Sequence, residues 1–113
     1  MKREELLSSI RLRLPIENVS LEDDLEGLDF NGVILSKVRF VDCSLMKVRF
    51  SGAVVSGCDF SGCDMRDAHL KGASFVGTDF SRANFRGKKL KAFVSLTVIY
   101  RPRHLKEAKL GNR

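Results

Sequence analysis

The chain has 113 residues, enough for one domain, and its 43% hydrophobic and 30% charged residues are typical of a globular protein. Its formal net charge is +6, which suits an acidic partner but does not identify one. No apolar run approaches the roughly 18 residues of a membrane span. The amino terminus carries Glu4 and Glu5 and lacks the apolar core segment of a signal peptide. We therefore expect a cytoplasmic protein without a membrane span; a substrate of a specialised secretion system would have the same features.

Residues 2–14 are predicted to form a short amphipathic helix. Leu6, Ile10 and Leu14 recur at every fourth position, which places them on one side of a helix. Pro15 is expected to end the helix, because the residue before a proline disfavours the helical conformation. We assign residues 1–20 to a segment that caps the fold that follows.

A large apolar residue then occurs at every fifth position from Leu25 to Leu90. A period of five matches neither the helix nor the strand, so a short structural repeat is indicated. The residue two positions earlier is small or β-branched between residues 33 and 83, and glycine often stands two positions later. Each repeat thus supplies one large and one small inward residue, outward polar residues and a turn.

Segments such as Ala73-Ser-Phe-Val-Gly and Ala83-Asn-Phe-Arg-Gly resemble the A(D/N)Lxx motif of pentapeptide-repeat proteins. The resemblance covers about 70 residues, and we assign the repeat domain to residues 21–92. It implies an all-β solenoid, a right-handed quadrilateral β-helix with four repeats per coil, in which residues twenty apart in the sequence stack. The fourteen repeats would then form about 3.5 coils.

Residues 93–113 abandon the repeat and form a basic tail. Residues 93–100 are apolar and β-branched, which predicts a strand, and Pro102 and Gly111 bracket a predicted short basic helix. An unpaired strand edge invites pairing with another chain. We therefore propose a self-association site at the residues on one side of this strand: Val94, Leu96, Val98 and Tyr100.

The repeat accounts for the cysteines, because Cys43, Cys58 and Cys63 all occupy the small inward position. Cys43 and Cys63 are twenty residues apart, so a disulfide is conceivable, but a reducing compartment would disfavour it. No histidine or second cysteine pair shares their column, so we predict no metal site. Seven of the eight phenylalanines occupy the central inward position, which predicts a core of stacked rings.

No group of residues points to catalysis. His69 lies at an outward position and His104 in the tail, and no nucleophile, base and orienting residue converge. The aspartates recur because one position of the repeat favours Asp or Asn. We predict neither enzymatic activity nor a cofactor.

Twenty-residue stacking gathers three apolar residues on one outward face. Ile34 and Val54 fall in one column, and Val76 falls in the next. A contiguous exposed apolar patch often marks a contact. Either the tail strand or the amino-terminal helix covers this face, or it binds a protein partner or a second copy in a homodimer.

Basic residues gather in a stripe on the neighbouring face and in the tail. Residues 86–113 contain nine Lys and Arg against one Glu, net +8, whereas residues 1–85 have a net charge of −2. Such a region attracts nucleic acid or an anionic surface. The candidate residues are Arg49, Lys71, Lys88, Lys89, Lys91, Arg101, Arg103 and Lys106.

The leading hypothesis is a bacterial, non-catalytic binding or scaffolding module that acts through protein–protein contacts and associates with itself. The first alternative is binding of nucleic acid or an anionic surface through the basic tail. The resemblance supplies another alternative, because the best understood pentapeptide-repeat proteins shield DNA gyrase and resemble an acidic DNA duplex. No outward column of this chain is consistently acidic, so gyrase or topoisomerase binding is kept only by family analogy.

Overall fold

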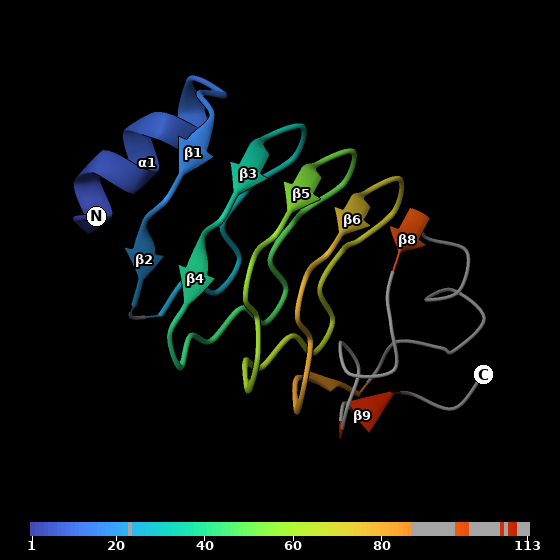
Figure 1. The fold of residues 1–113 in the computed structure, drawn as a ribbon. Coiled ribbons are helices and arrows are strands. Elements are labelled where there is room, and N and C mark those ends of the chain that lie inside the picture. Colours follow the sequence, from blue (N-terminus) through green and yellow to red (C-terminus); the bar gives the residue numbers. More distant parts are fainter. Residues whose placement is uncertain (23, 87–96, 100–106, 108, 111–113) are drawn as a thin grey trace.

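The structure is a computed structural model that describes residues 1–22, 24–86, 97–99, 107 and 109–110. Its described part contains one helix and nine short strands, which wind into a stack of coils (Figure 1). Helix α1 spans Arg3–Arg11. The strands are β1 (Ile16–Glu17), β2 (Ser20–Leu21), β3 (Ile34–Ser36), β4 (Arg39–Phe40), β5 (Val54–Ser56), β6 (Ser74–Val76), β7 (Asn84–Phe85), β8 (Thr97–Ile99) and β9 (Lys109–Leu110).

The coils stack with the predicted spacing of twenty residues. One side of the stack is a parallel sheet in the order β1-β3-β5-β6-β8, in which Leu35 lies beside Val55 and Val55 beside Phe75. The other sides are joined by parallel bridges at the same spacing, such as Asp29 to Arg49 and Arg39 to Asp59. The stack is therefore a four-sided β-helix.

Both ends of the stack depart from the spacing of twenty. Ile16 pairs with Leu35 and Leu21 with Phe40, an offset of nineteen residues, so the coils begin before the boundary at residue 21 expected from the repeat. At the other end, Phe75 pairs with Val98, an offset of twenty-three. Five strands on one side mean four turns between β1 and β8, more than the predicted 3.5 coils.

Strand β9 corrects the prediction of a helix over residues 102–110. Its residues Lys109 and Leu110 pair in parallel with Asn84 and Phe85, so they form part of a further coil. The other residues of that predicted helix, except Glu107, lie outside the described part of the chain.

Stacked phenylalanine rings fill the interior of the coils, as predicted. Phe40 and Phe60 stack with their ring centroids 4.4 Å apart, and Phe60 and Phe80 stack at 5.3 Å. The three cysteines are buried in the small inward position, which confirms that they fill the core. Desolvation raises the pKa of the Cys63 thiol to about 11.

Helix α1 covers the first coil by burying Leu6 and Ile10 against the core. It is shorter than predicted, because a Schellman motif ends it before Pro15. The amide of Leu14 donates to the carbonyl of Ser9, the amide of Arg13 donates to that of Ile10, and Arg13 has a φ of 56°. Leu14, expected on the buried side, is 48% exposed. None of the described helices could cross a membrane.

Candidate protein-binding faces

The outward surface of strands β3, β5 and β6, here called the sheet face, carries the apolar residues expected there. Ile34 lies directly beside Val54, and Val76 lies beside Ser56. Ile34, Val54 and Val76 are 48%, 46% and 41% exposed. The six outward residues of these three strands are Ile34, Ser36, Val54, Ser56, Ser74 and Val76, and none of them is charged.

Local sequence explains why this side forms strands while the other sides mostly form turns. On the other sides, the residue before the large apolar one is often Asp or Asn, and its side chain accepts a hydrogen bond from the backbone amide two residues later. Asp59 accepts from Ser61 at 2.8 Å, and Asp79 from Ser81 at 2.8 Å. On the sheet face this position holds no Asp or Asn: it is Ile34, Val54 or Ser74, and the β-branched Ile34 and Val54 favour extended backbone.

The sheet face is not covered in the way that one sequence interpretation suggested. Strand β8 pairs with β6 as the last strand of the same sheet, so it extends the face and does not lie over it. Helix α1 lies at the first end of the stack, beside β1 and β2 (Figure 1). Val54, at the centre of the face, is exposed.

The basic stripe lies on the side that precedes the sheet face. Arg49 bridges to His69, and Lys71 follows in the next column; all three side chains are exposed. The first member of the Arg49 column is Asp29, whose carboxylate pairs with Arg13 at 3.1 Å. The stripe therefore begins in the second coil.

Most of the predicted tail residues lie outside the described part of the chain: Lys88, Lys89, Lys91, Val94, Leu96, Tyr100, Arg101, Arg103 and Lys106. Val98 is described and belongs to β8, opposite Phe75 of β6. The strand proposed as an unpaired edge is thus paired on one side along Thr97–Ile99.

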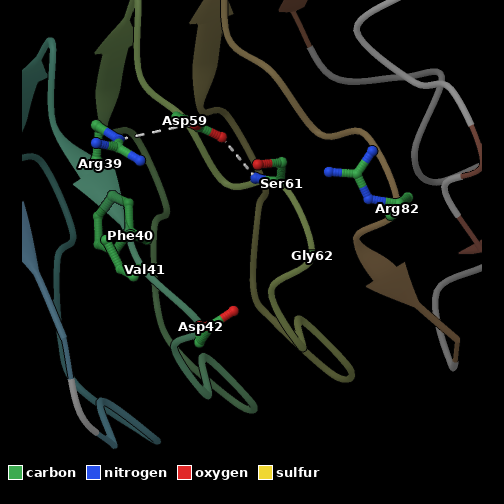
Figure 2. Close-up of a pocket in the computed structure, with 8 residues that line it drawn as sticks. All are labelled: Arg39, Phe40, Val41, Asp42, Asp59, Ser61, Gly62 and Arg82. Atoms are coloured by element: carbon green, nitrogen blue, oxygen red, sulfur yellow. Dashed lines mark hydrogen bonds and ion pairs between the residues drawn. The ribbon is translucent and has the colours of Figure 1, made fainter.

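A recess of about 250 Å³, which the sequence did not point to, lies on the side that follows the sheet face (Figure 2). The Arg39–Asp59 pair, with 4.0 Å between Nε and Oδ2, and Arg82 flank Ser61 in this view. The recess is open because Gly62 stands at a corner that Asp42 and Arg82 occupy in the coils before and after it. A glycine between charged residues at spacings of twenty is the signal that could have revealed it.

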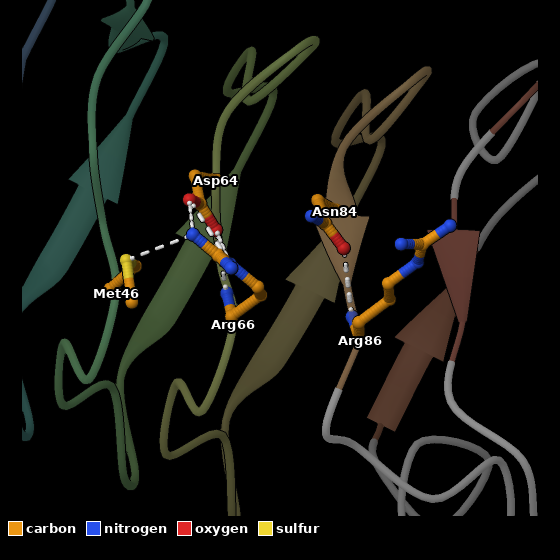
Figure 3. A network of polar contacts seen from close by, with 5 residues as sticks. All are labelled: Met46, Asp64, Arg66, Asn84 and Arg86. Carbon is orange, nitrogen blue, oxygen red and sulfur yellow. Dashed lines mark hydrogen bonds and ion pairs between the residues drawn. The ribbon is translucent and has the colours of Figure 1, made fainter.

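A polar network on the side opposite the sheet face ties two coils together (Figure 3). Arg66 donates to both carboxylate oxygens of Asp64, at 2.8 Å from Nη2 to Oδ2, and to the sulfur of Met46 at 3.4 Å. The hydrogen bonds from Arg66 lower the pKa of Asp64. In the next coil, the side chain of Asn84 accepts a hydrogen bond from the backbone amide of Arg86. This charge pair is satisfied internally, so it supplies no free group for chemistry.

Among the described residues, no three His, Cys, Asp or Glu side chains are grouped as metal ligands would be. His69 is exposed and lies beside Arg49 of the preceding coil.

The model of the family "Pentapeptide repeats" matches this chain in eight copies, over residues 24–62 and 49–87. The chain belongs to the pentapeptide-repeat family. Its members fold as right-handed β-helices, which confirms the fold class predicted from the sequence. A comparison with curated proteins gave no match.

Several solved structures are similar to this chain. Full-length QnrB1, a plasmid-mediated fluoroquinolone resistance protein, is 26% identical with a TM-score of 0.62, over 66% of this chain and 38% of QnrB1. This pentapeptide-repeat chain thus matches well under half of QnrB1. A thylakoid-lumen protein of Arabidopsis thaliana is 23% identical, with a TM-score of 0.45 over 76% of this chain and 60% of that one. Rfr23 of the cyanobacterium Cyanothece 51142 is 16% identical, with a TM-score of 0.43 over 99% and 97%.

Proposed function

We propose that this protein is a non-catalytic binding or scaffolding module that acts through protein–protein contacts and associates with itself through the sheet face. The observation that supports this proposal is the exposed group Ile34, Val54 and Val76 on a face without charged outward residues in β3, β5 and β6. Burying exposed aliphatic surface is favourable by about 25 cal/mol per Å². Desolvating a charge would oppose that gain, and this face has none to desolvate in its three central strands.

Self-association is tested by sedimentation equilibrium of wild type and of Val54→Lys, from micromolar to millimolar concentration. The matched control is Ser44→Lys, which introduces the same charge at the same repeat position on the opposite side of the stack. We expect wild type and Ser44→Lys to dimerise and Val54→Lys to remain a monomer. Wild-type protein that is monomeric throughout, or Val54→Lys that dimerises like wild type, would contradict self-association through this face.

A second candidate is binding of nucleic acid or an anionic surface by the basic stripe and the tail. Arg49 and Lys71 are exposed on one side of the stack, and the sequence after residue 85 is strongly basic. Affinity for a single-stranded oligonucleotide should then fall steeply with salt, because bound counterions are released. The double variant Arg49→Ser, Lys71→Ser should weaken binding and reduce the salt dependence. A flat salt response would argue against this candidate.

A third candidate, by family analogy, is interaction with DNA gyrase or another topoisomerase. The likeness to a fluoroquinolone resistance protein supports testing it. The expected observation is a changed rate of gyrase supercoiling at high protein concentration, together with direct binding. Absence of both effects would remove this candidate. For each of these functions we expect a cytoplasmic location in a bacterium, which fractionation of the native cell would test.

A further inference from the structure

One side chain of the first coil makes a hydrogen bond that elsewhere in the stack is made within a single turn. In several turns, a backbone amide donates to the carboxylate of the aspartate two residues earlier, as Ser61 does to Asp59 at 2.8 Å. Ser51 has no such partner, because the residue two positions before it is Arg49. Its amide donates instead to Oδ1 of Asn31 in the preceding coil, at 2.8 Å. The side chain of Asn31 therefore joins two coils.

Asn31 is also the only asparagine of the sequence that precedes a glycine. In an Asn-Gly pair the glycine nitrogen can attack the side-chain amide carbon of the asparagine, because glycine has no Cβ to hinder the approach. Gly32 has a φ of 72°, a left-handed conformation that glycine adopts without strain. The turn itself thus favours the residue that makes the pair reactive.

The reaction is a spontaneous deamidation that needs only water. The nitrogen of Gly32 forms a bond to Cγ of Asn31, the side-chain carbon–nitrogen bond breaks, and ammonia leaves with the proton of the Gly32 amide. Water then opens the cyclic imide to give aspartate or isoaspartate. Isoaspartate adds a methylene group to the main chain, which would disturb the turn in which the amide of Val33 donates to the carbonyl of Phe30 at 3.0 Å.

In the native stack, Ser51 holds both reacting groups. Its amide donates to the side-chain oxygen of Asn31, and its carbonyl accepts from the amide of Gly32 at 3.0 Å. Cyclisation requires Cγ of Asn31 to turn toward the nitrogen of Gly32, which breaks the first bond, and requires loss of the amide proton that makes the second. We propose that Asn31–Gly32 is a deamidation site that the contact with Ser51 keeps closed, and that it opens when the first and second coils separate.

Peptide mapping by tandem mass spectrometry tests this proposal on the full chain. Residues 14–37 form one tryptic peptide, which contains both Asn31 and the exposed Asn18. Asn18 precedes the β-branched Val19 and serves as the internal reference. In mildly alkaline buffer we expect Asn31 to convert at least about tenfold faster in guanidinium chloride than in the native protein, because native conversion requires a minority of opened molecules.

The variant Arg49→Asp tests whether the contact with Ser51 provides the protection. The introduced carboxylate would accept the amide of Ser51, as other aspartates of the stack do for the amide two residues later, and would release Asn31. Aspartates in neighbouring coils are compatible with the stack at this repeat position, because Asp59 already bridges to Asp79. The matched control Arg49→Ala removes the same guanidinium but supplies no acceptor.

We expect Asn31 to deamidate about two- to tenfold faster in native Arg49→Asp than in native Arg49→Ala, the factor for the loss of one ordinary hydrogen bond. Equal native rates in the two folded variants would overturn the role of Ser51. Wild-type Asn31 that converts as fast in the native protein as in denaturant, or that converts no faster than Asn18 in denaturant, would overturn the whole proposal. The wild-type comparison does not depend on the folding of either variant.

Discussion

Arg13 and Asp29 join the capping segment to the first coil through an ion pair 3.1 Å long between Nη2 and Oδ2. Arg13 is also the left-handed residue that ends helix α1, and its guanidinium donates to the carbonyl of Ile10. One side chain thus closes the helix and contacts the coil beneath it. The pair is half exposed, so its contribution to stability is small, but it makes a defined test of the cap.

Asp29→Asn is expected to destabilise the protein by less than about 1 kcal/mol at neutral pH, as for other exposed ion pairs. The amide of Asn31, with Arg13, holds the pKa of Asp29 below its ordinary value of 3.8. The carboxylate therefore stabilises the native state above that pH, and this stabilisation is lost as the pH falls through the lowered native pKa. Urea unfolding should show a difference at pH 7 that shrinks below about pH 4. Glu26→Gln, an exposed carboxylate in the same coil, should show no comparable difference.

Phe60→Ala is expected to lower the free energy of unfolding by about 3–5 kcal/mol, the usual cost of emptying a buried aromatic site. Phe60 is fully buried and lies between the rings of Phe40 and Phe80 in the coils before and after it. Phe60→Leu retains much of the volume and should cost less. Urea midpoints measure both. Equal and small effects would mean that the ring stack contributes little.

Gly52→Ala is expected to destabilise the protein by about 1 kcal/mol through the backbone alone. Gly52 has a φ of 70°, and an added Cβ would meet no atom within 4 Å. The matched test is Lys47→Gly, at another corner with a φ of 58°. Glycine adopts a positive φ without strain, which should stabilise that variant by up to about 1 kcal/mol. The net gain is smaller, because glycine also raises the conformational entropy of the unfolded chain. Thermal or urea unfolding of the pair should give opposite signs.

The native thiols are expected to react slowly with a disulfide reagent at pH 8. Cys43, Cys58 and Cys63 are buried, and desolvation raises the pKa of Cys58 and brings that of Cys63 to about 11. The thiolate is the reactive form, so few of these sulfurs are reactive until the chain unfolds. Denaturant should release all three thiols, and Val54→Cys should add one fast-reacting thiol in the native state. Rapid reaction of unsubstituted native protein would show that the coils open readily.

The core of this fold could be predicted from the sequence because the pattern within each repeat shows which residues point inward. A large residue at every fifth position and a small one two positions before it place Phe40, Phe60 and Phe80 in one stack without knowledge of the rest of the chain. The same local rule correctly assigned the cysteines to the interior and Ile34, Val54 and Val76 to the outside.

The two ends and the surface recess depended on the tertiary structure. Ile16 and Leu21 extend the core, but they pair with residues nineteen positions later and are therefore out of phase with the five-residue repeat. Strand β8 pairs with residues twenty-three positions earlier, so the repeat pattern does not predict its place in the sheet either. Residues can be lost or gained at such places because backbone pairing between coils, not the count of residues, holds the stack together. The recess at Gly62 likewise exists only because three coils bring distant corners together.

The sequence therefore determined the period, the core and the outward faces, all of which depend on which way each residue points within its own five. The tertiary structure decided where the coils begin and end, how Arg13 closes the cap, and that β8 extends the sheet face without covering it. Those outcomes depend on backbone pairing between segments about twenty residues apart. A local sequence pattern does not predict that pairing where the spacing between paired residues departs from twenty.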